Sequence, residues 1–585
     1  MTAADDRSWV DDYNPNALWC RLLVEQLVTA GIRDVVLCPG GRSAAMALQI
    51  FHDPRLSTTV QTDERIGGFM ALGMALTGGR PVAVCTTSGS AVGNLVPALL
   101  EADASKIPLV VLSCDRPVAY RGTGAWQTTD QLAICAPFVR AAVDLPEPGD
   151  DASAMVDALE EVAATLVRAT REGQEGPVQL NVPFPGTWCP TAEQPGWLGP
   201  PPAPALAAVE MPTADGPALQ PEVAVAELLD ELGVGAGLRG LIVAGPGLRA
   251  PRSAVDILAE MTGYPVLADA ASGLRRPAVR NVVCEADALV FHPFLARTKP
   301  ELIIRLGQAP VSHTVHSYLA AQDCPQLRDV GADVAGDVLS DSSYGLGSLD
   351  TVVARRLGEC LGPGDGEWRS WWEQAAARAR RGREHALRRL AWGESRAVDA
   401  VCRASDGFDF IHLANSMSVR NANLHLSPEA RTMPVFANRG LNGIDGTIAT
   451  FAGELIAGKA RGLLLIGDQA ACHDLSALGA LRQDGVRGCI CVVNNGGGAV
   501  FDFVACHRLP GYKEAIRHPP SVDLAGAAQA FGLPFRRCLD EVQLAQALTD
   551  SDSQAAVTLI EVMVPPDSLA GELDRLFLSM VRQRH

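Results

Sequence analysis

Two polar motifs near the C-terminal end of the sequence combine the residue types of a magnesium site. Asp468 directly follows one apolar run, and Asn495 and Gly497 follow the next such run. A carboxylate oxygen, an amide oxygen and a glycine backbone carbonyl, completed by a diphosphate and water, suit the octahedral coordination of Mg²⁺. We therefore predict Asp468, Asn495 and Gly497 as metal ligands, with Mn²⁺ as the alternative ion.

A second group of candidate residues lies in the N-terminal part of the sequence. Glu64 opens a helix of small residues, TDERIGGFMALGMAL (62–76), after a strand-like VQT segment. Alone, such a glutamate is explained by the helix dipole, an interaction worth under about 1 kcal/mol. A glycine turn around Ser88, TTSGSA (86–91), follows and also opens a helix. Together the two segments resemble the pyrimidine-binding domain of thiamin-diphosphate enzymes, and the C-terminal pair GD and NN resembles their diphosphate-binding motif.

Parallel strands are the elements that must position these residues. Short apolar runs bounded by glycine and proline alternate with helical segments, which is typical of α/β domains. Strands are predicted at 34–38, 81–85, 108–113, 238–245, 265–268, 302–306, 462–466, 488–493 and 556–562, and a helix is predicted at 91–102. Because ligands of open parallel sheets bind outside the carboxyl ends of strands, both halves of the metal motif should face one site.

The predicted fold class is α/β, with three doubly wound parallel-sheet domains. The expected order is a pyrimidine-binding domain (1–190), a Pro/Gly/Ala-rich linker (191–220), a middle Rossmann-like domain (221–345), a helical connector (346–395) and a diphosphate- and Mg²⁺-binding domain (396–585). The linker prediction depends on composition, because proline- and glycine-rich stretches favour extended or irregular chain.

Composition narrows the class of protein. The 585 residues are 48% hydrophobic and 20% charged, as in ordinary globular chains, and no apolar run reaches the roughly 18 residues of a membrane span. The acidic start lacks the features of a secretory signal, so we expect a cytoplasmic protein without membrane association. A net charge of −18 disfavours nucleic acid as a partner. The fifteen cysteines form no CxxC pair and are expected to be buried, reduced thiols.

Longer segments narrow the resemblance to one family. The sequence resembles 2-succinyl-5-enolpyruvyl-6-hydroxy-3-cyclohexene-1-carboxylate synthases in much of its first and third predicted domains and only loosely in the middle one. The matching segments are CPGGRS (38–43), TDERIGGFMALGMAL (62–76), TTSGSAVGNLVPALLEA (86–102), SCDRP (113–117), GAWQTTDQ (124–131), NSMSVR (415–420), NRGLNGIDG (438–446), GDQAACHDLSAL (467–478) and VVNNGGGAVF (492–501). Their joint occurrence is far more specific than the general thiamin motif.

The resemblance implies a reaction, a cofactor and an assembly. Enzymes of this family decarboxylate 2-oxoglutarate on thiamin diphosphate and add the succinyl carbanion to isochorismate, in menaquinone biosynthesis. In such enzymes the two cofactor-binding domains come from different subunits, so a homodimer is the expected minimum, with a homotetramer as the alternative. A buried glutamate, here Glu64, bonds the pyrimidine ring so that the cofactor can lose its C2 proton. Ile444 is expected to bend the cofactor.

The resemblance also assigns roles to individual residues. The expected catalytic residues are Glu64, Gln127 and Arg42, and the expected cofactor contacts are Glu64, Ser88, Asn415, Ile444, Asp468, Gln469, Asn495 and Gly497. Substrate contacts are expected from Arg42, Arg116, Gln127, Ser416, Arg420, Arg439, Val500 and Phe501. Both substrates are multiply anionic, and an arginine fork matches a carboxylate better than any other side chain. Ser416 and Arg420 would hold the far carboxylate of the succinyl group, and Arg42 and Arg116 the carboxylates of isochorismate.

Three departures from the family pattern leave the acceptor open. Gly41 replaces a serine, Trp126 replaces a small amide, and His313-Thr314 stands where the family has a basic pair. These changes remove polar or positive groups, some of them from the acceptor side. One alternative is therefore a divergent thiamin-diphosphate decarboxylase or carboligase with another acceptor or donor, in secondary metabolism.

Two further classes remain as alternatives. A catalytically silent scaffold or regulatory homologue would have no chemical use for Glu64, Asp468 and Asn495, which are all present. A nicotinamide-dependent dehydrogenase would need a G-x-G-x-x-G turn after its first strand, and GLIVAGPGL (240–248) only approaches that pattern.

Overall fold

The computed structural model describes most of the chain, and it does so as two compact units. The described residues are 15–149, 152–171, 174–185, 221–275, 280–329, 339, 343–427, 433–483, 485–554 and 556–582. The first unit comprises Met1–Asp215 with Asp445–Lys459, and the second comprises Gly216–Ile444 with Ala460–His585. The predicted linker, 191–220, lies outside the described residues, and the domain boundaries stay predictions.

The first unit contains a six-stranded parallel sheet in the order β2-β1-β3-β4-β6-β5. The strands are β1 (Asp34–Leu37), β2 (Ser57–Val60), β3 (Val82–Thr86), β4 (Leu109–Asp115), β5 (Ala142–Asp144) and β6 (Val178–Pro183). Its helices are α1 (Pro15–Thr29), α2 (Ala44–Phe51), α3 (Glu64–Gly78), α4 (Ser90–Asn94), α5 (Val96–Ala104), α6 (Gln131–Cys135) and α7 (Ala152–Thr170). The three strands predicted here are confirmed, because continuous apolar runs suit strands that are buried on both faces.

Two local predictions for the first unit were wrong in detail. The helix predicted at 91–102 is divided into α4 and α5, and Pro97 lies in the first turn of α5. Proline lacks the N–H that a continuous helix would need at that position, so a new helix begins there instead. The strand before Glu64 ends at Val60, earlier than the VQT segment suggested.

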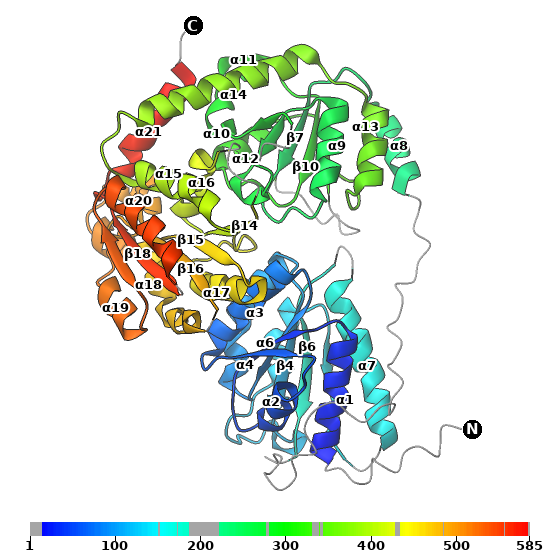
Figure 1. Cartoon of the computed structure of the whole chain (residues 1–585). Coiled ribbons are helices and arrows are strands. Elements are labelled where there is room, and N and C mark those ends of the chain that lie inside the picture. The colour runs from blue at the N-terminus through cyan, green and yellow to red at the C-terminus, as the bar shows by residue number, and fades with distance from the viewer. Residues whose placement is uncertain are drawn as a thin grey trace. The chain divides into compact units, whose positions relative to one another are not determined.

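Helix α17 (Thr447–Gly458) belongs to the first unit, although its sequence lies within the predicted third domain. It packs closely against α3, as the two helices in Figure 1 show. A Cβ atom at Gly73 would lie 2.0 Å from the Thr450 carbonyl oxygen, and one at Gly453 would lie 2.0 Å from the Met70 carbonyl oxygen. The two glycines therefore allow the backbones of α3 and α17 to approach each other.

The second unit contains the two remaining sheets. The middle sheet has the order β12-β11-β10-β7-β8-β9 and is parallel throughout. Its strands are β7 (Gly240–Ala244), β8 (Val266–Ala268), β9 (Val282–Val283), β10 (Leu302–Leu306), β11 (Gln326–Arg328) and β12 (Ser343–Gly345). Helices cover both faces of this sheet, because Leu241 and Val243 pack into one apolar cluster and Ile242 and Ala244 into another.

The segment predicted as a helical connector packs against the middle sheet. It forms α13 (Thr351–Leu361) and α14 (Gly366–Leu387), which are labelled in Figure 1. Trp368 and Trp372 of α14 are fully buried, and the Trp368 indole donates a hydrogen bond to the Gly240 carbonyl at 3.0 Å. The aromatic residues of this segment therefore contribute to the core.

The third sheet has the order β14-β13-β15-β16-β18-β17, again with only parallel pairs. The strands are β13 (Phe410–Leu413), β14 (Val435–Phe436), β15 (Arg461–Gly467), β16 (Arg487–Asn494), β17 (Phe535–Cys538) and β18 (Val557–Met563). The helices most relevant to the site are α15 (Glu394–Ala404), α16 (Met417–His425), α18 (Asp468–His473) and α21 (Leu569–Arg582). Three parallel sheets flanked by helices confirm the predicted α/β fold class.

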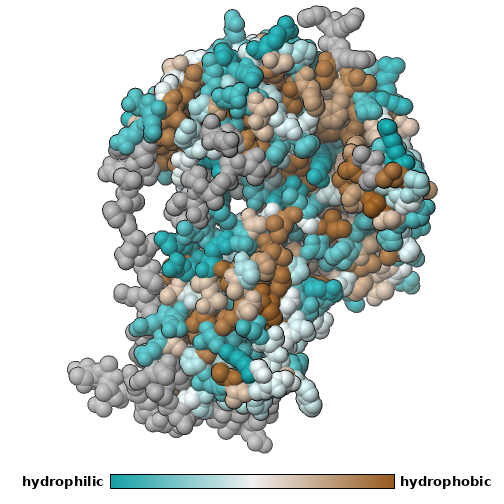
Figure 2. All heavy atoms as spheres, turned by 180° about the vertical axis from the view of Figure 1, so that it is seen from behind, coloured by the Kyte–Doolittle hydropathy of each residue, from teal (hydrophilic) through white to brown (hydrophobic). Residues whose placement is uncertain are grey.

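The described cysteines are free thiols, as predicted, and most of them are buried. Cys85 with Cys114 and Cys489 with Cys491 are in sulfur–sulfur hydrogen-bond contact at 4.0 and 3.9 Å, without a disulfide bond. On the face shown in Figure 2, hydrophobic side chains form patches among hydrophilic ones. Within the described ranges, no helix has the length and apolar character needed to cross a bilayer.

Candidate active site

Neighbouring strand ends of the third sheet bring the predicted cofactor residues together. Asn415 follows β13, Asp468 follows β15 and Asn495 follows β16, and these three strands are adjacent. In the register of β15 and β16, Gly467 pairs with Val493, so Asp468 and Asn495 emerge at the same edge. They line a cavity of about 140 Å³. The predicted residues in its wall are Asn415, Ser416, Ile444, Asp468, Gln469, Asn495, Gly497, Val500 and Phe501.

The Asp468 carboxylate is buried and held by backbone donors. Its two oxygens accept hydrogen bonds from the Gln469 N–H at 2.7 Å and the Gly497 N–H at 2.8 Å. Burial raises the pKa of Asp468, and these backbone hydrogen bonds oppose the rise. A carboxylate has about four lone-pair positions, so each oxygen keeps capacity for a cation.

The glycines after β16 allow the loop to approach Asp468. Gly496 and Gly497 have φ values of +75° and +119°, which side chains with a Cβ rarely adopt. A Cβ at Gly497 would also lie 2.8 Å from the Arg517 carbonyl oxygen. The Gly497 carbonyl, a predicted metal ligand, accepts a hydrogen bond from the Ala499 N–H at 2.7 Å and retains a second lone pair.

The two asparagines of the NN pair have different surroundings. The Asn494 side chain is satisfied within the chain, because its amide donates to Glu561 at 2.7 Å and its Oδ1 accepts from the Gly496 N–H at 3.2 Å. The Asn495 amide donates to Glu394 at 2.7 Å, whereas its buried Oδ1 has no hydrogen-bond partner among the described residues. Leaving a buried acceptor unpaired costs about 1–3 kcal/mol, so this oxygen is suited to a ligand that the chain does not supply.

Glu394 is a site residue that the sequence reasoning missed. It opens α15, is 4% exposed and lines the same cavity. Burial raises the pKa of Glu394 to about 7, and the hydrogen bond from Asn495 opposes this shift. No local signal distinguishes this glutamate from an ordinary acidic residue in the first turn of a helix, where the dipole favours it.

Asn415, Ser416 and two predicted substrate arginines form a connected group. The Asn415 amide donates to the carbonyls of Asn438 and Gly443, both at 2.6 Å, and its Oδ1 accepts from Arg439 at 2.6 Å. Arg420 donates to the Ser416 carbonyl at 2.5 Å. Ser416 has φ +65°, and such strain in a non-glycine residue is characteristic of functional sites. The structure thus places Ser416 in the cavity wall and connects Arg420 and Arg439 to the wall residues Ser416 and Asn415, and the substrate roles of the three residues stay predictions.

The remaining predicted cofactor and substrate residues of the second unit are Gln469, Ile444, Val500 and Phe501. The Gln469 amide donates to the backbone carbonyls of Arg517 and His518, so it ties the C-terminal end of η10 (Lys513–Arg517) to the cavity. Ile444, Val500 and Phe501 supply apolar wall, and Phe501 is 39% exposed in the single chain.

The first unit repeats the pattern of adjacent strand ends. Glu64 follows β2, Arg42 follows β1, Ser88 follows β3 and Arg116 follows β4, and these strands are consecutive neighbours in the sheet. Glu64 accepts a hydrogen bond from the Asn94 amide at 3.1 Å and is half-buried, where a buried carboxylate was expected. Ser88 is buried, and its Oγ has no partner in the described part of the chain.

Arg42, Arg116 and Gln127 lie together above this sheet edge. Arg116 donates to the Gln127 side-chain oxygen at 3.0 Å, and Arg42 donates to the Phe184 carbonyl at 3.2 Å. Burial first, and the like charge of Arg116 second, lower the pKa of Arg42. Two arginines whose charges repel each other favour an anion at this position. Gln127 has φ +52°, a second strained residue among the predicted ones.

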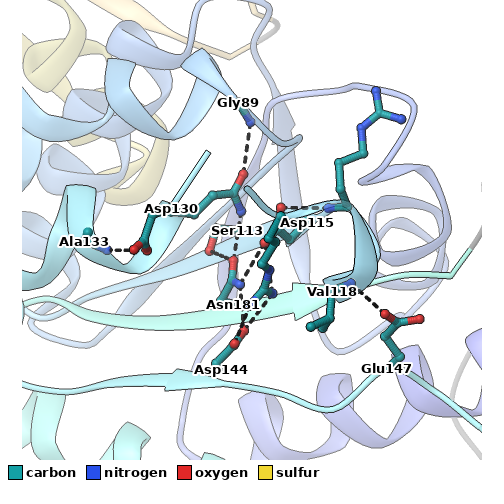
Figure 3. A network of polar contacts seen from close by, with 12 residues as sticks. Gly89, Ser113, Asp115, Val118, Asp130, Ala133, Asp144, Glu147 and Asn181 are labelled. Atoms are coloured by element: carbon teal, nitrogen blue, oxygen red, sulfur yellow. Dashed lines mark hydrogen bonds and ion pairs between the residues drawn. The ribbon is translucent and has the colours of Figure 1, made fainter. Parts of the chain in front are cut away.

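A buried polar network supports the loop that carries Arg116 and Gln127 (Figure 3). Asn181 donates to Asp115 at 3.1 Å and to Asp144 at 2.8 Å, and it accepts from Ser113 at 2.9 Å. Gln131 joins Asn181 to the Gly89 N–H, so it links this network to the Ser88 turn. The Asn181 bonds join side chains of β4, β5 and β6, and Asp115 at the end of β4 also accepts a hydrogen bond from the Arg116 N–H at 2.7 Å, which holds Arg116 in a defined place.

The departures from the family pattern are visible in the structure. Trp126 is 89% exposed and precedes Gln127 in the same loop. A Cβ at Gly41 would find nothing within 4 Å. His313 and Thr314 lie in the first turn of α12 (His313–Ala320) in the second unit, and neither lines the cavity around Asp468.

The glycine turn after β7 of the middle sheet is covered by another loop of the chain. A Cβ at Gly245 would lie 1.9 Å from the Gln308 carbonyl oxygen, and the Gly245 N–H donates to Leu306 at 2.9 Å. The turn therefore packs on the loop after β10, where a dinucleotide-binding turn would offer its N–H groups to a pyrophosphate. This contact argues against the dehydrogenase alternative.

Comparison with known protein families finds a match in the N-terminal part of the chain. Residues 20–134 match the family described as "Thiamine pyrophosphate enzyme, N-terminal TPP binding domain". The fold and this match define the chain as a thiamin-diphosphate-dependent enzyme.

Full-length relatives make the assignment narrower. The chain is 32% identical to a 2-succinyl-5-enolpyruvyl-6-hydroxy-3-cyclohexene-1-carboxylate synthase from Myxococcus xanthus, over 97% of this chain and 98% of the relative. It is 34% identical to the synthase from Rubrobacter xylanophilus, over 94% and 95% of the two chains, and 32% identical to that from a Roseiflexus species over the same shares. The chain belongs to this synthase family, as the resemblance predicted.

Proposed function

We propose that this chain is a transferase that decarboxylates 2-oxoglutarate and joins the succinyl unit to isochorismate. The observation that carries the proposal is the nearly full-length similarity to synthases of this reaction, combined with a cavity lined by the expected residues. A scaffold role is less consistent with these features, because it would not require Asp468 and the unpaired oxygen of Asn495 to face one cavity.

The cavity of the second unit fits the metal and diphosphate end of the cofactor. Asp468, the Asn495 Oδ1 and the Gly497 carbonyl are the oxygen donors that Mg²⁺ prefers, and Mn²⁺ accepts the same set. When bound, thiamin diphosphate supplies an electron sink for the electron pair left by loss of CO₂. Glu64 would hold the pyrimidine ring nitrogen N1′, and Ile444 would support the bent cofactor from below.

The arginines of the two units are proposed to bind different substrates. Arg420 and Arg439, beside Ser416, would hold the distal carboxylate of 2-oxoglutarate. Arg42 and Arg116 would hold the acceptor carboxylates, with Gln127 close to the reacting carbon. A charge-assisted bidentate pair is roughly twice as strong as a neutral hydrogen bond, which suits recognition of anions by a chain of negative net charge.

A second candidate function differs only in the acceptor. It is favoured by Trp126, which exposes 89% of its surface beside Gln127, and by the empty surroundings of Gly41. A bulky apolar ring and a lost hydroxyl favour an acceptor with fewer polar groups than isochorismate.

The deciding experiment is mass spectrometry of the products formed from 2-oxoglutarate with and without isochorismate. The proposed function predicts CO₂ release and a joined product only when both substrates and Mg²⁺ are present. Decarboxylation without a joined product would favour the second candidate, and the absence of decarboxylation would contradict both. The minimum assembly is proposed to be a homodimer, and the cytoplasmic location stays a prediction.

A further inference from the structure

Glu394 accepts hydrogen bonds from two asparagine amides at once. Its Oε1 accepts from Asn421 at 2.7 Å, and its Oε2 accepts from Asn495 at 2.7 Å. When it is ionised, the Glu394 carboxyl group has no donor, so the group of each amide that faces it must be the NH₂. Because an amide has its oxygen opposite its nitrogen, the Asn495 Oδ1 is turned away from Glu394 and into the buried position where it has no partner in the described chain.

We propose that Glu394 is a positioning residue that fixes the orientation of the Asn495 amide, so that oxygen and not nitrogen faces the Mg²⁺ position. This inference rests on the proposed function, because it concerns the metal site of that function. An amide NH₂ cannot coordinate Mg²⁺, so a rotated Asn495 would remove one of the oxygen donors. Loss of a hydrogen bond that holds a metal ligand in place commonly lowers metal affinity by about ten- to hundredfold.

The surroundings of Glu394 hold it in place for this role. A Cβ at Gly393 would lie 1.9 Å from the Glu572 side-chain oxygen, so only glycine allows Glu572 to approach. Glu572 accepts from the Ser395 N–H at 2.8 Å and thereby anchors the start of α15. Trp392 donates to the Met563 carbonyl at 2.9 Å, which fixes the chain just before α15.

The test compares Mg²⁺ affinity in the presence of saturating thiamin diphosphate, measured by calorimetry, for the native chain and three variants. Glu394→Met has similar length but no oxygen acceptor, and its Mg²⁺ affinity should fall about ten- to hundredfold. Glu394→Gln keeps one acceptor for Asn495, and the Asn421 amide, whose Oδ1 has no described partner, can rotate to accept from the new NH₂. The Mg²⁺ affinity of Glu394→Gln should stay within about threefold of the native value, because the neutral glutamine can still orient the Asn495 amide.

Glu572→Gln is the matched control, because it removes the charge of a neighbouring buried carboxylate and keeps an oxygen that can accept from the Ser395 N–H. Its Mg²⁺ affinity should equal that of the native chain. Equal losses in Glu394→Met and Glu394→Gln would assign the effect to charge and overturn the inference, as would native affinity in Glu394→Met. Thermal unfolding of the metal-free variants checks their folding.

If Glu394→Met does not fold, Glu394→Ala replaces it, since it also lacks an acceptor. Failure of both to fold would assign Glu394 to folding and overturn the inference. Failure of the proposed function is distinguishable, because the native chain itself would then take up no thiamin diphosphate with Mg²⁺.

Discussion

At the scale of single residues, the predicted site residues differ in whether the chain already satisfies their polar groups. The Asn415 side chain has all its polar groups engaged by the 438–443 loop and by Arg439. The Oδ1 of Asn495 and the Oγ of Ser88 are buried without a described partner. Unpaired buried groups are rare in folded proteins, so these two atoms indicate where ligand atoms are expected.

Glu64→Gln should leave cofactor binding largely intact and slow exchange of the cofactor C2 proton by about 10²–10⁴-fold. The neutral amide cannot act as the anionic partner of the pyrimidine ring. Proton exchange followed by NMR in deuterated buffer measures the effect. Asp63→Asn is the control, because Asp63 is paired with Arg65 at 2.7 Å and asparagine can still cap α3. C2 proton exchange at the native rate in Glu64→Gln would contradict the role assigned to Glu64.

Arg420→Ala should raise the KM for 2-oxoglutarate by about ten- to hundredfold, because a charge-assisted hydrogen bond contributes about 1.5–3 kcal/mol. Initial rates at varied 2-oxoglutarate and saturating acceptor provide the measurement. Arg420→Lys should recover only part of the loss, since an ammonium does not form the planar fork. An unchanged KM would indicate a donor other than 2-oxoglutarate.

At the scale of elements, the contact between α3 and α17 depends on glycine. Gly73→Ala should destabilise the protein by about 1–3 kcal/mol, because its Cβ would lie 2.0 Å from the Thr450 carbonyl oxygen. Gly78→Ala in the same helix is the control. Its Cβ would meet only the Arg80 side chain at 3.6 Å, so helix propensity should make this change neutral or stabilising. Denaturant unfolding measures both, and equal stabilities would contradict the close helix contact.

At the scale of the whole molecule, the resemblance predicts an active site that two subunits share. Glu64→Gln and Asp468→Ala should each be inactive, and the Asp468 variant should lose Mg²⁺-dependent cofactor binding. After the two are unfolded and refolded together, mixed dimers contain one site with both native residues. About a quarter of native activity should return if subunits combine at random. Light scattering should show at least twice the chain mass of 61.6 kDa. No recovery would indicate sites built within one chain.

The sequence by itself determined nine strands of the three sheets and several of the polar residues that follow them. Apolar runs and glycine turns are local patterns, so Asp468, Asn495, Ser88 and Arg116 could be placed at strand ends without knowledge of the fold. The orientation of the Asn495 amide, in contrast, depends on Glu394 from a distant helix, and α17 joins the first unit through contacts with α3. Only the tertiary structure decides such features, because they arise from packing between elements that are far apart in the chain. Local sequence patterns carry no information on such contacts.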